Sequence, residues 1–184
     1  MVRDILITNN LSGKKEPLIT VDKGRVKMYA CGVTTYDHCH IGHAMQAIFF
    51  EVIRNYLEFA GYHVTYVRNY TDVDDKIIKR AEEQGINPKT LAEAIIESSQ
   101  SDMEALGIRP ADHEPKVSET IDEIIKMTQT LVEKGAAYPT PGGDVYYKVK
   151  SKNDYGKLSN RDPKELRSGT REIIEDGKQD SIDF

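Results

Sequence analysis

Cysteine, long apolar runs and net positive charge are all scarce in this sequence. Its 184 residues include only two cysteines, which show no pairing pattern and therefore favour a reducing compartment over a disulfide-stapled secreted scaffold. No apolar run approaches the roughly 18 residues of a membrane-spanning helix, and the start does not resemble a signal peptide. We therefore expect a cytoplasmic protein without a membrane partner.

The charge balance and the missing loop motifs exclude further classes. A net charge of −5 argues against a broad nucleic-acid-binding surface, and hence against DNA as a partner, because such surfaces gather cations. Neither a G-x-G-x-x-G nor a Walker-type phosphate loop is present, and we find no repeats or low-complexity tracts. Hydrophobic residues make up 39% of the chain, which is enough for the core of one domain with an insertion.

A strand, a turn and a helix are predicted in the first third of the chain. Apolar and polar residues alternate over positions 26–30, and the run ends at Cys31-Gly32, a pattern that predicts a strand. Polar, turn-prone residues follow. Apolar side chains then recur at helical spacing, so we expect one helix over residues 40–60 that stops at Gly61. This order is typical of the opening strand–helix unit of a nucleotide-binding sheet, whose ligands lie at the carboxyl ends of its strands.

The helix start carries a His-x-Gly-His element. His40 and His43 are three residues apart and therefore lie on one helix face, while Gly42 leaves room for a flat ring against the backbone. Free N–H groups and partial positive charge at a helix start suit phosphate. These residues indicate a site for a nucleoside triphosphate. The alternative is that the two histidines cap the helix or bind adventitious metal.

Two long blocks carry a family resemblance. The segments Cys31-Gly-Val-Thr-Thr-Tyr-Asp-His-Cys-His-Ile-Gly-His43 and Tyr66-Val-Arg-Asn-Tyr-Thr-Asp-Val-Asp-Asp-Lys-Ile-Ile-Lys-Arg80 resemble cysteinyl-tRNA synthetases, which are class I aminoacyl-tRNA synthetases. Three later segments resemble that family in order: Gly143-Asp-Val-Tyr146, Tyr155-Gly-Lys-Leu-Ser159 and Asp180-Ser-Ile-Asp-Phe184. The related cysteine ligase of mycothiol synthesis shares the Cys-Gly turn, but its phosphate element usually reads Thr-His-Leu-Gly-His. The blocks therefore favour the synthetase.

The resemblance implies a fold, a reaction and partners. The fold is the N-terminal half of a Rossmann-like class I synthetase nucleotide-binding domain, α/β in class, with a helical or α+β insertion. The reaction converts cysteine and ATP, with Mg²⁺, into cysteinyl adenylate and pyrophosphate, and then transfers the acyl group to tRNA(Cys). A local basic stripe can bind tRNA despite the net negative charge. The enzyme's task in the first step is to align the carboxylate with the α-phosphate and to stabilise the charge that develops there.

Site residues follow by likeness, position by position. The family's catalytic, phosphate-contacting histidines correspond to His40 and His43. Thr34 and Gly42 join them as ATP-binding residues, and Gly42 accommodates the adenosine. The substrate cysteine is expected beside two residues, Gly32 and Thr71. Neither histidine needs to act as a base, because the attacking carboxylate is already ionised.

Cys31 corresponds to a zinc ligand of the family, and the zinc binds the substrate thiolate. Cysteine and serine differ by one atom, and a shape-based pocket separates such near-isosteres by only about 1–3 kcal/mol. Zinc prefers sulfur and deprotonates a coordinating thiol, which hydroxyl cannot match. The family's other protein ligands, a Cys, a His and a Glu, lie beyond this chain. The alternative for Cys31 is packing as an ordinary small residue, which is also our interpretation of Cys39.

The second block predicts a strand over residues 63–69 and a helix over 75–84, with Asp74 or Asp75 as the cap. The acidic residues Asp72, Asp74 and Asp75 fit capping and loop fixing better than a divalent-metal site. Lys76, Lys79 and Arg80 form either a solvated helix face or a surface that approaches tRNA.

The remaining pattern divides the chain. We expect a leading arm over 1–24 with strands at 5–7 and 18–21 around a polar turn, and the first half of the catalytic domain over 25–108. A helix from residue 87 to 107, a linker over 108–115, an amphipathic helix over 117–134 and a hairpin around Gly142-Gly143 follow. Residues 109–178 are read as the insertion, and 179–184 as the start of the second half. The helix over 117–134 is expected to turn five apolar side chains inward: Ile121, Ile124, Ile125, Leu131 and Val132.

The family's later segments have no counterpart here, including its Lys-Met-Ser-Lys-Ser loop. The sequence is therefore interpreted as an N-terminal fragment with little or no activity alone, whose isolated half-sheet would expose a strand edge and an apolar face. The alternative from a different class is a non-enzymatic module that keeps the turn and helix as a nucleotide- or zinc-binding element.

Overall fold

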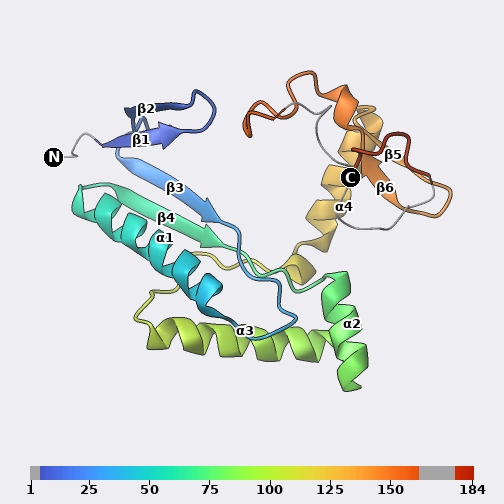
Figure 1. The fold of residues 1–184 in the computed structure, drawn as a ribbon, viewed down its shortest axis with the longest axis horizontal. Helices are drawn as coiled ribbons and strands as arrows, with labels where there is room; N and C mark the ends of the chain where they lie inside the picture. Colours follow the sequence, from blue (N-terminus) through green and yellow to red (C-terminus); the bar gives the residue numbers. More distant parts are fainter. Residues whose placement is uncertain (1–4, 162–176) are drawn as a thin grey trace. The chain divides into compact units, whose positions relative to one another are not determined.

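The structure is a computed structural model that describes residues 5–161 and 177–184 (Figure 1). The chain divides into two compact units. The first contains residues 19–121 and the second contains residues 5–18 with the described residues after 121. None of the described helices is long and apolar enough to cross a membrane.

The first unit is built on a parallel strand pair joined by a helix. Strand β3 (Arg25–Ala30) leads through a turn into α1 (Ile41–Phe59), and β4 (His63–Arg68) returns beside β3. The pairing is parallel and runs from Arg25 opposite His63 to Ala30 opposite Arg68. Parallel neighbours need a crossover connection, which α1 provides (Figure 1). The predicted strand–helix–strand order is therefore confirmed.

Two further helices complete this unit. Helices α2 (Asp75–Gln84) and α3 (Pro88–Ala105) begin at the caps Asp74 and Asn87, whose side chains accept the backbone N–H of the residue two further on. Apolar residues of both helices form one buried cluster: Ile77, Ala81, Leu91, Ala92 and Ile95. The predicted bounds of α2 are confirmed, and of the two predicted caps, Asp74 and Asp75, the structure shows Asp74. Helix α3 ends two residues earlier than expected.

The segment predicted as a linker is tied to the outer edge of β4. It forms isolated parallel bridges from His113 to Val67 and from Lys116 to Tyr70. The Asp112 carboxylate accepts the Tyr66 backbone N–H at 2.7 Å. A charged segment without apolar alternation thus behaves as a partial third strand, before the short 3₁₀ turn η1 (Val117–Glu119).

The second unit holds two antiparallel hairpins. Strands β1 (Leu6–Asn9) and β2 (Lys14–Pro17) form the first, and β5 (Ala137–Pro139) and β6 (Val145–Tyr147) form the second. The hairpin around residues 142–143 is confirmed. The strand expected over 18–21 is wrong, because its place is taken by the polar run of β2. Pairing with β1, rather than apolar alternation, makes that run a strand.

Helix α4 (Ile121–Glu133) corrects a second prediction. The helix exists, but the described residues do not bury Ile121, Ile124 or Ile125, all of which are exposed. Leu131 and Val132 are half-buried. The amphipathic pattern identified the helix correctly and its packing wrongly, because a pattern cannot say whether a covering surface is present.

The end of the described chain packs on the second hairpin. The Asp183 carboxylate, almost fully buried, accepts the Tyr138 hydroxyl at 2.8 Å and the backbone N–H of Val149 at 3.0 Å. Val149 opens the 3₁₀ turn η2 (Val149–Ser151). The predicted domain bounds stay predictions, and the predicted insertion over 109–178 includes residues that lie outside the described part of the chain.

Candidate functional site

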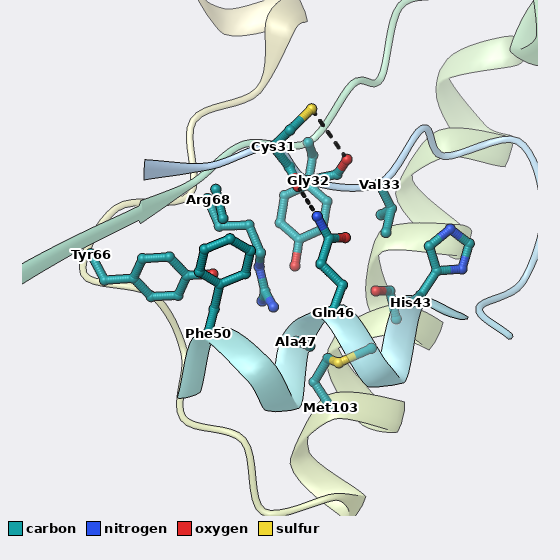
Figure 2. A pocket seen from close by; sticks show the side chains of 13 residues that line it. Cys31, Gly32, Val33, His43, Gln46, Ala47, Phe50, Tyr66, Arg68 and Met103 are labelled. Atoms are coloured by element: carbon teal, nitrogen blue, oxygen red, sulfur yellow. Dashed lines mark hydrogen bonds between the residues drawn. The ribbon is translucent and has the colours of Figure 1, made fainter. Parts of the chain in front are cut away.

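A small cavity lies where β3 ends, with a volume of about 20 Å³. Its walls come from the end of β3, the first turns of α1, strand β4 and helix α3 (Figure 2). Residues from all four elements line it: Ala30, Cys31, Gly32, Val33, His43, Gln46, Ala47, Phe50, Tyr66, Arg68, Tyr70, Ser99 and Met103. The predicted metal ligand Cys31 and the predicted phosphate residue His43 therefore both line one cavity, whereas His40, Gly42, Thr34 and Thr71 are not among its lining residues.

Cys31 is an exposed free thiol. Its Sγ lies 3.8 Å from the carbonyl oxygen of Gly32, and its own carbonyl accepts the Gln46 side-chain amide at 3.3 Å (Figure 2). The exposure argues against ordinary packing as the reason for a cysteine at this position. Cys39 differs, because it is half-buried and packs against Ala47, Met103 and Ile108.

Gly32 is required by a close approach of two backbones. A Cβ at this position would lie 1.5 Å from the carbonyl oxygen of Asn69. The Gly32 N–H donates to the Asn69 side-chain oxygen at 2.8 Å, and the Tyr29 hydroxyl donates to the same oxygen at 2.9 Å. Asn69 thus ties the end of β3 to the end of β4.

The turn after Gly32 is held by Thr71. The Thr71 N–H donates to the carbonyl of Val33 at 3.0 Å, and the Thr35 N–H donates to the carbonyl of Thr71 at 3.1 Å. Thr35 is fully buried, and Thr34 is bridged to Thr71 in parallel fashion. The residue predicted to bind ATP, Thr34, and the residue predicted to contact cysteine, Thr71, therefore lie side by side.

His40 and His43 form a reciprocal cap at the start of α1. The Nδ1 of His40 accepts the Gly42 backbone N–H at 3.0 Å, and the Nδ1 of His43 accepts the His40 backbone N–H at 3.2 Å. Their rings stack with centroids 4.0 Å apart. His40 is the N-cap residue before the helix, so the prediction that the helix begins at His40 is wrong by one residue. The capping alternative is therefore a real role of both rings.

The same geometry determines what the rings offer to a ligand. Because both Nδ1 atoms accept hydrogen bonds, each neutral ring carries its proton on Nε2. Burial, and secondarily the neighbouring His40, lowers the pKa of His43 below its ordinary value. A neutral His43 presents one Nε2–H donor to an acceptor such as phosphate oxygen.

Gly42 makes room for the cap. A Cβ there would lie 2.8 Å from Cε1 and 3.0 Å from Nδ1 of His40. A larger residue would displace the His40 ring from its position over the first backbone N–H groups. Glycine is therefore required by the histidine itself, before any adenosine is considered.

The acidic residues after β4 fix local structure, as predicted. Asp72 accepts the backbone N–H of Ser118 at 3.0 Å and also the Ser118 hydroxyl, while Asp74 caps α2. Among residues 5–161 and 177–184, no three His, Cys, Asp or Glu side chains gather closely enough to hold a metal ion. Cys31 supplies one sulfur donor, and a zinc site needs about four ligands or three plus substrate.

The basic residues of α2 tie that helix to the turn before α1. Arg80 pairs with Asp37 at 3.4 Å, and the Lys76 ammonium lies 5.3 Å from the centre of the Tyr36 ring. Lys79 is exposed. Two of the three residues considered for tRNA contact are thus engaged within the unit.

Three residues of the site were not singled out from the sequence: Gln46, Arg68 and Asn69. Arg68 lines the cavity and pairs with Glu114 at 2.7 Å. Asn69 and Arg68 belong to the second block quoted above and lie at the carboxyl end of β4. Their position at a strand end could therefore have marked them from the sequence. Nothing in the local pattern marks Gln46, which is one of many polar residues on α1.

Comparison with known proteins assigns the class. A family model described as the tRNA synthetases class I (C) catalytic domain matches residues 17–184. Since that match covers nearly the whole chain, the chain belongs to the family of class I tRNA synthetase catalytic domains of this type.

Eight curated proteins that are 47–52% identical to the chain all bear the name cysteine–tRNA ligase. The chain is 52% identical to the cysteine–tRNA ligase of Maridesulfovibrio salexigens, over 96% of the chain and 36% of the relative. It is 49% identical to that of Desulfotalea psychrophila and 48% identical to that of Bacillus licheniformis, each over 98% of the chain and 37% or 38% of the relative. The chain thus spans little more than a third of the length of the curated relatives that it matches.

Proposed function

We propose that this chain forms the cysteine- and ATP-binding part of a cysteine–tRNA ligase, on half of a Rossmann-like nucleotide-binding fold. The observation that carries the proposal is that Cys31 and His43 line one cavity at the carboxyl end of a parallel strand. Relatives at about 50% identity bear the name of that activity. The substrates are cysteine, ATP with Mg²⁺, and tRNA(Cys).

The start of helix α1 is the proposed phosphate site. Two Nε2–H groups, from His40 and His43, lie at the start of α1, where the helix dipole is positive. Aligned donors and the helix dipole favour negative charge where it develops on the α-phosphate. The imidazoles act as hydrogen-bond donors and not as bases, because the cysteine carboxylate attacks in its ionised form.

Cys31 is the proposed sulfur ligand of a zinc ion whose other ligands come from outside the described residues. An exposed, unpaired thiol at a strand end fits that role. When bound, zinc would supply preference for a thiolate over a hydroxyl. Gly32 and Thr71 set the position of Cys31, since they hold the strand end and the turn together.

The test is cysteine-dependent exchange of pyrophosphate into ATP. We expect little exchange from the 184-residue chain alone, because it brings one zinc donor, and clear exchange when the remaining part of a relative is supplied with it. In that mixture Cys31→Ser should reduce the preference for cysteine over serine more than tenfold. Absence of cysteine-dependent exchange in an assembled mixture would contradict the proposed function.

A further inference from the structure

One side chain, that of Asn69, contacts groups on both sides of the proposed cysteine site. Asn69 directly follows β4. Its amide oxygen accepts the backbone N–H of Gly32 at 2.8 Å and the hydroxyl of Tyr29 at 2.9 Å. Its amide nitrogen donates to Oγ1 of Thr71 at 3.3 Å. Because a side-chain amide oxygen has two lone pairs, these two donors use the whole acceptor capacity of Asn69.

The peptide group between Cys31 and Gly32 is held at both of its polar atoms. Its N–H, which belongs to Gly32, donates to Asn69. Its carbonyl, which belongs to Cys31, accepts the side-chain amide of Gln46 on α1 at 3.3 Å (Figure 2). A peptide group has one donor group and one acceptor group, so side chains from two different elements fix its orientation. That orientation sets the direction in which the exposed Cys31 side chain leaves the backbone.

The two strand ends are also held together by backbone contacts that do not involve the Asn69 side chain. The N–H of Thr71 donates to the carbonyl of Val33 at 3.0 Å, and the N–H of Thr35 donates to the carbonyl of Thr71 at 3.1 Å. The pairing of β3 with β4 runs to the last residue of both strands. The backbone therefore joins the strands, and the further effect of the Asn69 amide is on the groups that it contacts.

We propose that Asn69 is a positioning residue for cysteine binding. Its amide holds the Cys31–Gly32 peptide so that Cys31, the proposed zinc ligand, points into the cysteine site. Because Oγ1 of Thr71 accepts from Asn69, the hydroxyl proton of Thr71 can be donated to the bound cysteine. The inference rests on the proposed function, since it concerns the cysteine of that reaction.

Hydrogen exchange of the Gly32 amide, followed by NMR on the 184-residue chain alone, measures the positioning contact itself. Asn69→Ala removes the acceptor of this N–H, and we expect the amide to exchange about tenfold faster than in the parent chain. Asn69→Asp keeps an oxygen that can accept the same N–H and should leave its exchange near the parent rate. Parent-like exchange of Gly32 in Asn69→Ala would overturn the inference, and so would Asn69→Asp exchange as fast as that of Asn69→Ala.

The role in binding is tested by pyrophosphate exchange in a mixture of the whole chain with the remaining part of a relative. Loss of a residue that orients a ligand-binding group typically costs about 10–100-fold, so Asn69→Ala should raise the KM for cysteine by about tenfold or more. The KM for ATP should stay near the parent value, because the phosphate-contacting His40 and His43 are oriented by each other. Asn69→Asp should raise the KM for cysteine less than Asn69→Ala does.

Asn87→Ala is the matched control, because it removes the same kind of side chain from the N-cap of α3. It lowers stability without touching the Cys31–Gly32 peptide, and both KM values should stay near those of the parent chain.

The outcomes separate this inference from the proposed function. In a mixture that is active with the parent chain, an unchanged KM for cysteine in Asn69→Ala, or equal rises in the KM for cysteine and for ATP, would overturn the inference alone. A rise in the KM for cysteine as large in Asn87→Ala would overturn it as well, because general loss of stability would then explain the effect. Absence of cysteine-dependent pyrophosphate exchange with the parent chain would contradict the proposed function, and with it the role of Asn69 in cysteine binding.

Discussion

At the scale of single residues, Gly32 is a position with no space for a side chain. A methyl group there would have to occupy the place of the Asn69 carbonyl oxygen, 1.5 Å away, and backbone cannot move aside as a flexible side chain can. We expect Gly32→Ala to lower the free energy of unfolding by more than about 2 kcal/mol, since overpacking against rigid neighbours typically costs 1–3 kcal/mol or more. Urea denaturation measures the loss.

Gly142→Ala is the control for that substitution, because a Cβ at Gly142 meets its nearest atoms at 3.6 and 3.7 Å, which is ordinary contact. It should change the free energy of unfolding by less than about 1 kcal/mol. Similar losses for both glycine variants would mean that the close approach of Gly32 to Asn69 does not hold in solution.

His43 gives a prediction on protonation. Burial, and then the neighbouring His40, lowers its pKa from the ordinary 6.5, so the native state binds fewer protons than the unfolded state in acid. The contribution of His43 to stability is therefore complete above pH 6.5 and is lost as the pH falls from there through the lowered pKa. NMR titration of the ring protons should place the pKa of His43 below the ordinary 6.5, and a pKa at or above 6.5 would contradict the capping geometry.

At the scale of elements, substitutions of His40 at the start of α1 can distinguish its role in capping the helix from a role in binding ATP. Asparagine is a good N-cap, while alanine is a poor one. His40→Ala should cost about 1 kcal/mol of unfolding free energy, and His40→Asn should cost much less. Both variants lose the imidazole and should bind ATP more weakly than the parent chain by calorimetry. Parent-like ATP affinity in His40→Asn would restrict His40 to a structural role.

Elements were predictable where local pattern decides them. The helical spacing of α1 could be recognised from the sequence. The caps of α2 and α3 could be recognised as well, because Asp74 and Asn87 directly precede apolar residues at helical spacing. Strand β2 was missed because Lys14–Pro17 is polar and becomes a strand only through β1. The 112–117 segment was read as a linker for the same reason, since its bridges to β4 depend on residues more than 40 positions away.

The site was predictable in part. Residue types marked Cys31, His40 and His43, and the strand–helix order placed them near one strand end. The role of Asn69 could not be predicted from the sequence, because it depends on how closely two strand ends approach each other. The reciprocal histidine cap was weighed only as an alternative, since a sequence does not give ring orientations.

At the scale of the whole unit, an ion-pair network joins α1, β4 and the 109–114 segment. Asp112 contacts the largely buried Arg54 and accepts the Tyr66 backbone N–H. We expect Asp112→Ala to cost about 2–4 kcal/mol of unfolding free energy, because it leaves a buried cation and a backbone donor with fewer partners. Chemical denaturation provides the measurement.

Asp22→Ala is the matched surface control, since its pair with Lys27 is exposed on both sides. Exposed pairs contribute about 0–1 kcal/mol, so its loss should be small. If Asp112→Ala were no more costly than Asp22→Ala, the network would not be what holds the 109–114 segment to the sheet.

The central claim, that Cys31 and the histidine-capped start of α1 belong to one binding site, is tested most directly by thiol alkylation with and without Mg²⁺-ATP. We expect saturating ATP to slow iodoacetamide labelling of Cys31 at least fivefold, to leave Cys39 unchanged as the internal reference, and to give no protection in a His40→Ala/His43→Ala variant. Labelling of Cys31 at the same rate with and without ATP, or equal protection in that variant, would contradict the account.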